Sequence, residues 1–211
     1  MLKKIIKLFL PPIIPIVIER MRTYLTKEVL FGGHDALFKK AFVKESVYAE
    51  YGCGASTIWV ANNIDCKIFS VDSSAGWIGQ VKKECKSLKP ILHLADVGPV
   101  GDWGMPIDYE KSDNFTDYTD WIWTDNKKPN IILIDGRFRV CCFLTCLING
   151  EKGMKIFFDD YTNRPMYHFV EKFLKPTETC GRQALFVIPE RELLDIGAIR
   201  DAINKFRFVF D

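Results

Sequence analysis

The stretch Glu50-Tyr51-Gly52-Cys53-Gly54-Ala55-Ser56-Thr57 places a glycine-rich turn between a short apolar run and a segment with helical periodicity. Glycines let the backbone approach a ligand at places where a Cβ would collide, and the first turn of the following helix presents free N–H groups. Nucleotide-like ligands bind to α/β folds at such strand-turn-helix units. Two glycines alone do not identify the ligand, but the residues that end the neighbouring strands restrict the choice.

Two acidic residues close the next two expected strands. Asp72, followed by Ser73, ends the second strand, where a carboxylate can accept hydrogen bonds from ribose hydroxyls. Asp96 ends the third strand at the same edge of the sheet, and its carboxylate would suit an adenine amino group. A dinucleotide-binding turn would have a third glycine where this chain has Thr57, which disfavours a nicotinamide cofactor. The predicted cofactor-binding residues are Glu50, Gly52, Gly54, Ser56, Asp72, Ser73 and Asp96.

From Ser46 to Asp211, apolar runs, polar turns and helical periodicity alternate, which is typical of alternating strands and helices. Short, nearly unbroken apolar runs indicate strands covered on both faces. We therefore predict an α/β fold with a doubly wound, seven-stranded, mostly parallel sheet and helices on both faces, a Rossmann-like arrangement. The predicted strands are Val47–Tyr51, Lys67–Val71, Ile91–Ala95, Asn130–Ile134, Lys155–Phe158, Gln183–Ile188 and Phe206–Phe210. The predicted helices are Thr57–Asn62, Ala75–Ser87, Arg139–Asn149, Pro165–Phe173 and Asp195–Asn204.

Length and composition fit one globular domain. The 211 residues stay below the ~250 residues at which a single core tends to split. Apolar residues make up 48% and charged residues 27%, as in ordinary globular proteins. Residues 46–211 are expected to form the cofactor-binding domain, and residues 1–45 an N-terminal basic and apolar arm with helices. The net charge of +2, from 29 basic and 27 acidic residues, gives no general attraction to nucleic acid.

The seven cysteines form an odd count, and no pair has the CxxC spacing of a zinc or redox-dithiol site. Cys141, Cys142 and Cys146 fall in an apolar run, where free thiols behave as small hydrophobes, and we expect them in a helix core rather than as nucleophiles. A reduced, cytoplasmic protein is therefore expected.

Residues 1–22 combine three lysines with the apolar stretch Leu8–Ile18, which superficially resembles a secretory signal. Three prolines interrupt any helix in that stretch, and it is too short to span a bilayer. We interpret it as a mature arm that packs on the domain or on a second subunit of a homo-oligomer. The alternative is a peripheral contact with a membrane surface.

The stretch Gly98–Lys128 is rich in Gly and Pro at its start and in Asp, Asn and Thr later, and it is predicted to be a long loop. Loops of this length in compact domains often serve as lids or binding loops. The stretch contains three tryptophans, which would either stack on a sugar ring or be buried and anchor a surface loop; they are Trp103, Trp121 and Trp123.

Over roughly Ser46–Phe173 the chain resembles the class I S-adenosylmethionine-dependent methyltransferases. Glu50, Gly52 and Gly54 match the family's first motif, Asp72 its ribose-binding acid and Asp96 its adenine-side acid. The resemblance implies S-adenosylmethionine as the cofactor and an antiparallel seventh strand, which the usual strand order would place at Phe206–Phe210. Such an enzyme needs no activated nucleophile of its own, because its tasks are to align an electrophilic methyl group with the acceptor and to remove one proton from that acceptor.

The segments Ile134-Asp135-Gly136-Arg137 and Phe158-Asp159-Asp160-Tyr161 look like the two metal-binding segments of the macrocin and novobiocin type of sugar O-methyltransferases. That resemblance implies a magnesium ion held by Asp135, Asp159 and Asp160, which would bind vicinal hydroxyls and lower the pKa of the one to be methylated. The family has a further acid, proposed as general base, two residues after the first aspartate. This chain has Arg137 there, which puts both the base and the metal in question.

With that acid absent, the candidates for the catalytic base are Asp135, Asp159 and His168, since a carboxylate free of metal duty or a histidine can take a proton near neutral pH. Three arginines near these segments would bind a phosphate or carboxylate on the acceptor, or else form ordinary salt bridges; they are Arg137, Arg139 and Arg164.

The function expected from these features is S-adenosylmethionine-dependent O-methylation of a sugar hydroxyl, on a glycan or on a nucleotide-linked or lipid-linked sugar. Two alternatives stay open at this point. One is a methyltransferase for another small metabolite, such as a phenol or an amine. The other is a non-enzymatic module that keeps the fold and binds the cofactor, which Arg137 would permit.

Overall fold

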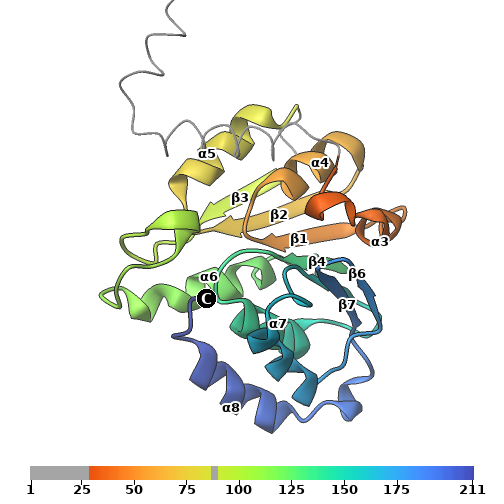
Figure 1. Ribbon diagram of the computed structural model, residues 1–211, viewed down its shortest axis with the longest axis vertical. Coiled ribbons are helices and arrows are strands. Elements are labelled where there is room, and N and C mark those ends of the chain that lie inside the picture. The colour runs from red at the N-terminus through yellow and green to blue at the C-terminus, as the bar shows by residue number, and fades with distance from the viewer. Residues whose placement is uncertain (1–28, 87–89) are drawn as a thin grey trace, which may run out of the picture.

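A seven-stranded sheet runs through the middle of the computed structural model, which describes residues 29–86 and 90–211 (Figure 1). The first five strands from one edge run parallel, and the last two form an antiparallel hairpin beside them. In spatial order the strands are β3 (Pro90–Leu94), β2 (Lys67–Asp72), β1 (Val47–Tyr51), β4 (Ile131–Ile134), β5 (Lys155–Phe158), β7 (Gln183–Val187) and β6 (Glu178–Cys180). The strand order reverses between β1 and β4, and ligands of open α/β sheets bind beyond the carboxyl ends of the strands at such a switch point.

Helices cover both faces of this sheet, which confirms the predicted fold class (Figure 1). One face carries α3 (Ala36–Lys40), α4 (Ala55–Asn63) and α5 (Ala75–Glu84). The other face carries α6 (Phe115–Asp120), α7 (Arg139–Asn149), α8 (Ile196–Phe206) and the 3₁₀ helix η5 (Pro165–Lys172). The short 3₁₀ helices η1 (Phe31–Gly33) and η6 (Arg191–Leu193) lie in connections.

Alternate residues of β1, β2, β4, β5 and β7 belong to two separate cores, because successive side chains of a strand point to opposite faces. Tyr48 packs on the α3 side, where the ring of Phe38 lies 5.8 Å from that of Tyr48 and 5.3 Å from that of Phe157. Ala49 and Tyr51 pack on the α7 side. The predicted core cysteines Cys141, Cys142 and Cys146 are all buried in α7.

Six of the seven predicted strands are present, and the predicted strand at Phe206–Phe210 is wrong. Phe206 is the last residue of α8, and the ring of Phe210 lies 5.9 Å from Phe115 and 6.1 Å from Phe138. Phe210 therefore packs against aromatic rings at the start of α6 and just before α7, while Phe208 and Val209 stay exposed. The antiparallel strand beside β5 is instead β7, and the missed seventh strand is β6, a short edge strand without an apolar pattern.

The stretch predicted as one long loop, Gly98–Lys128, contains α6 and the 3₁₀ helices η2 (Asp102–Gly104), η3 (Ser112–Asn114) and η4 (Trp121–Trp123). Two of the three tryptophans in this stretch pack against other residues of the domain. Trp121 stacks on His93 with ring centroids 4.7 Å apart, and buried Trp123 donates its indole N–H to the Tyr51 hydroxyl at 3.0 Å. Only Trp103, which is 60% exposed, remains available to a ligand.

The predicted arm of residues 1–22, with its membrane or subunit contact, lies outside the described residues. No helix within residues 29–86 and 90–211 combines the length and apolarity that crossing a bilayer requires.

Candidate cofactor and acceptor site

The glycine turn after β1 packs directly on the turn after β4. Gly52 has a φ of +93°, and a Cβ built there would lie 2.5 Å from the Gly136 Cα, so this position needs glycine for both conformation and space. Gly54 is extended, with a φ of −179°, and a Cβ there would meet no atom within 4 Å. The Gly54 N–H donates to the Thr57 hydroxyl at 3.0 Å, which fixes the start of α4. The turn is thus held in place while its outer side stays open.

Glu50, a predicted cofactor residue, lies beneath this turn rather than in front of it. Its side chain is fully buried and accepts hydrogen bonds from the hydroxyls of Ser56 and Thr57. Burial raises its pKa to about 8, and the nearby charge of Asp135 adds to the rise, while the two hydroxyls oppose it. Glu50 therefore supports the turn from below and does not line the cavity.

Asp72 ends β2 and faces the same turn from the side. One of its carboxylate oxygens accepts the Cys53 N–H at 2.9 Å, and the other accepts the Ser74 N–H at 2.7 Å. Burial raises its pKa to about 6, against the effect of these hydrogen bonds. The next residue, Ser73, donates its hydroxyl to the Gly104 carbonyl at 2.5 Å and so ties the Trp103 loop over Asp72.

A cavity of about 680 Å³ opens in front of these residues and extends to the carboxyl ends of β4 and β5. Trp77 and Trp103 stack on each other in its wall, with centroids 5.8 Å apart and planes 20° apart. Its polar lining contains the predicted residues Gly52, Gly54, Ser56, Asp72, Asp135 and Asp160, together with Arg137, Arg139, Arg164 and Arg182. This volume lies within the ~300–1,000 Å³ of ordinary small-molecule sites.

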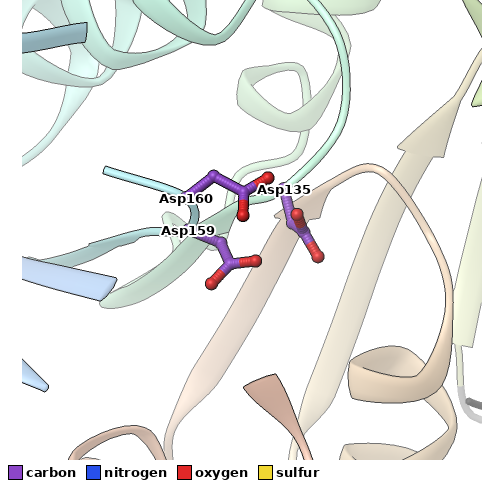
Figure 2. Close-up of side chains that lie close together, drawn as sticks. All are labelled: Asp135, Asp159 and Asp160. Carbon is purple, nitrogen blue, oxygen red and sulfur yellow. The ribbon is translucent and has the colours of Figure 1, made fainter. Parts of the chain in front are cut away.

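Asp135, Asp159 and Asp160 lie close together at the end of the cavity, because β4 and β5 are neighbouring parallel strands (Figure 2). One carboxylate oxygen of each lies within 4.8 Å of the others. The Asp135 side chain is 31% exposed, whereas the Asp159 side chain is fully buried. Burial raises the pKa of Asp159 well above its ordinary value and the charge of Asp135 adds to this, while Arg182 opposes it.

Three arginines pair with these three carboxylates. Arg182 contacts both oxygens of Asp159, at 3.0 and 2.6 Å. Arg164 lies 2.9 Å from Asp160, and buried Arg139 lies 3.2 Å from Asp135 and 3.4 Å from Asp160.

A divalent cation among these oxygens would lie beside three guanidinium groups, and the carboxylates would have to give up arginine partners to bind it. The donor spacing suits a hard cation, but the charge around it does not. The side chains as they stand therefore do not fit a resident magnesium ion.

Besides Glu50, Ser73 and Asp159, which were described above, the predicted site residues Asp96 and His168 do not line the cavity. Asp96 is exposed and forms an ion pair with Lys111, which lowers its pKa. His168 is exposed, and its Nε2 lies 3.0 Å from the Tyr161 carbonyl oxygen. The structure thus does not bring the imidazole to the three aspartates.

Sequence reasoning missed several lining residues. Trp77 lies in the first turn of α5, shortly after Asp72. Because this helix begins at the edge of the sheet where the cofactor was expected, its first turn could have been predicted to line the site. Arg182 lies in the turn between β6 and β7, and no signal pointed to it because β6 was not predicted. Phe31 and Gly32 of η1 complete one side of the cavity.

No protein-family model and no curated protein matches the chain. Among solved structures, the chain is similar to a methyltransferase-like protein from Silicibacter pomeroyi, at 29% identity and a TM-score of 0.69, over 82% of this chain and 92% of the other. It is also similar to the N-methyltransferase NodS from Bradyrhizobium japonicum in complex with S-adenosyl-L-homocysteine, at 11% identity and a TM-score of 0.47, over 82% and 98% of the two chains, a likeness too distant to bear on chemistry. With the strand order 3-2-1-4-5-7-6 and the glycine turn after β1, the first similarity shows that the chain has the Rossmann-like fold of the S-adenosylmethionine-dependent methyltransferases.

Proposed function

We propose that this protein is an S-adenosylmethionine-dependent methyltransferase whose acceptor is a hydroxyl group, preferably of a sugar. The observation that carries the proposal is the cavity, which joins an open glycine turn and a buried ribose-type acid at one end to a carboxylate at the other. The similarity to the methyltransferase-like protein from Silicibacter pomeroyi supports the same reaction class.

Asp72 has the capacity to bind ribose hydroxyls. An ionised carboxylate has about four acceptor positions, and the N–H groups of Cys53 and Ser74 use two of them. The remaining positions can accept hydrogen bonds from two vicinal hydroxyls. Trp77 and Trp103, in the same wall, offer aromatic faces to adenine.

Bound S-adenosylmethionine supplies an electrophilic methyl carbon, to which the acceptor oxygen bonds as the carbon–sulfur bond breaks. The chain has to orient the hydroxyl and take its proton. Asp135 is the best placed of the candidate bases, because it lines the cavity and is partly exposed. Asp159 is enclosed and held by Arg182, and His168 lies outside the cavity lining. We assign proton removal to Asp135, with Arg139 holding its carboxylate in position.

The test is a transfer assay with methyl-labelled S-adenosylmethionine and a panel of sugars, nucleotide sugars, phenols and amines. Label in a sugar is the expected result, and Asp135→Asn should lower kcat by ~100-fold to ~10,000-fold, the usual contribution of a general base. The affinity for S-adenosylmethionine should stay within about twofold in this variant, because Asn keeps the size of the side chain and its carbonyl can still accept from Arg139.

Label found only in phenols or amines would keep the reaction class and replace the acceptor. An Asp135→Asn variant with unchanged kcat would remove Asp135 as the base. A protein that binds the cofactor and labels no acceptor would favour the non-enzymatic module.

A further inference from the structure

Four arginines line the cavity, and their partners divide them into two groups. Arg139 is a structural residue, since all its N–H donors are used: Nε donates to the Gly136 carbonyl, and the two terminal nitrogens donate to Asp135, Asp159 and Asp160. Arg182 is held by Asp159. These two arginines neutralise the aspartate cluster and have little capacity for a ligand.

Arg164 and Arg137 differ from them. Arg164 contacts Asp160 and the Tyr167 hydroxyl, but its side chain is 41% exposed, so part of the guanidinium remains open to the cavity. Arg137 forms no ion pair with any residue in the described part of the chain, and its Nε is buried without a hydrogen-bond partner. Its charge acts on Asp72 and Asp211 only at a distance, where it lowers the pKa of each as a minor contribution. Buried polar groups of native proteins nearly always have a partner, so Arg137 is suited to one that arrives from the cavity.

Charge balance points to the sign of that partner. Asp135, Asp159 and Asp160 pair with Arg139, Arg164 and Arg182, whereas Arg137 of the same lining forms no ion pair with a described residue and interacts with Asp72 and Asp211 only at a distance. S-adenosylmethionine would add a net positive charge, because it carries a sulfonium and an ammonium against one carboxylate. A neutral sugar would leave this charge uncompensated in a partly enclosed site.

We propose that the acceptor carries an oxyanion, a phosphate or a carboxylate, which Arg137 binds with the help of Arg164. The inference rests on the proposed function, since it assumes that the cofactor occupies the end of the cavity near Asp72. A guanidinium presents its N–H groups as a planar fork that matches the two oxygens of such an anion. Arg137 follows Asp135 by two residues, so the anion would lie beside the hydroxyl that loses its proton.

The experiment is calorimetric titration of the full chain, saturated with S-adenosylhomocysteine, with glucose 1-phosphate, glucuronate and neutral glucose. At least one acidic sugar should bind ~10-fold or more tightly than glucose, and the stronger of the two identifies phosphate or carboxylate as the anion. Arg137→Gln should remove most of that difference and leave glucose binding unchanged, and Arg137→Lys should restore part of it. Arg200→Gln is the matched control, because it removes the same charge from an exposed position of α8 outside this cavity.

Equal binding of all three sugars, or acidic-sugar binding that Arg137→Gln leaves intact, overturns the inference. So does an Arg137→Gln variant that binds S-adenosylhomocysteine ~10-fold less tightly but methylthioadenosine normally, because methylthioadenosine lacks the amino-acid carboxylate and Arg137 would then serve the cofactor. Failure of the wild-type protein to bind S-adenosylhomocysteine would count against the proposed function. In that case anion binding by Arg137 is tested by titrating inorganic phosphate into the cofactor-free wild type and into the Arg137→Gln variant. Phosphate binding that is lost in the variant supports the inference, and equal binding by the two proteins refutes it.

Discussion

Replacing Gly52 with alanine tests how the cofactor turn is built. The φ of +93° would strain an alanine, at a cost of ~1–3 kcal/mol. Its Cβ would also lie 2.5 Å from the Gly136 Cα and 2.6 Å from the Gly136 nitrogen, and because these are backbone atoms they can yield only if the turns after β1 and β4 separate. Overpacking of this kind costs ~1–3 kcal/mol. The sum is a loss of ~2–6 kcal/mol, which for a chain of this length lowers Tm by roughly 4–24 °C.

Thermal and urea unfolding of the purified proteins measure this effect, with Gly79→Ala as the matched control. A Cβ at Gly79, within α5, would meet no atom within 4 Å, so alanine there should leave the protein unchanged or stabilise it by up to ~1 kcal/mol. At a temperature where both variants are folded, Gly52→Ala should also bind S-adenosylmethionine more weakly, because the separated turn no longer presents its open side. A Tm of Gly52→Ala within about 1 °C of wild type would refute the close contact between the two turns.

Four further results follow from the site. The affinity for S-adenosylmethionine should fall as the pH drops through about 6, where Asp72 gains a proton and loses acceptor capacity, and calorimetry at several pH values should find no such fall in Asp72→Asn. Folded Glu50 keeps its proton up to a pH of about 8 while the unfolded chain releases it above about 4.5, so stability contributed by this group declines as the pH rises between these values. Urea unfolding should therefore find Glu50→Gln more stable than wild type at pH 8.5 and equal to it at pH 4, and the opposite order would contradict the burial argument. Arg139→Met should cost ~3–5 kcal/mol in urea unfolding, because it leaves Asp135 and Asp160 without their buried partner, and a loss below ~1 kcal/mol would mean that the cluster does not depend on it. EDTA should leave methyl transfer unchanged, whereas activity lost in EDTA and restored by magnesium would show that a cation displaces the arginines.

The parallel half of the fold could be predicted from the sequence, because its strands are continuous apolar runs that end in turn residues. β1 and β5 agree with their predicted bounds, and the glycine turn meets Asp72 at the carboxyl edge through the Cys53 N–H, as their positions imply. At the antiparallel end, β7 was predicted as a strand but β6 was not. β6 has only three residues and no apolar alternation, and Phe210 after α8 packs against aromatic rings rather than pairing in a strand.

The direction of individual side chains could not be predicted either. Glu50 belongs to the cofactor motif, yet the alternation of the strand sends its carboxylate under the turn to Ser56 and Thr57. The aspartate cluster was found because adjacent parallel strands bring their ends together. Salt bridges of Arg139 and Arg164 were one of the two readings offered for these residues, but the pairing with Arg182 was not predicted, because Arg182 comes from a hairpin that is distant in the sequence. Arg182 is one of the three arginines whose charges make the cluster unsuited to a metal.

Cofactor binding is the central property of this site, and calorimetric titration of the wild-type chain and Asp72→Ala with S-adenosylmethionine and with NAD would measure it. We predict that the wild type binds S-adenosylmethionine with an affinity in the ~1 μM to ~1 mM range of enzyme substrates, that Asp72→Ala loses at least ~10-fold of it, and that NAD produces no binding. Binding of NAD instead, no binding of S-adenosylmethionine, or equal binding by Asp72→Ala would contradict the assignment of this cavity to the methyl donor.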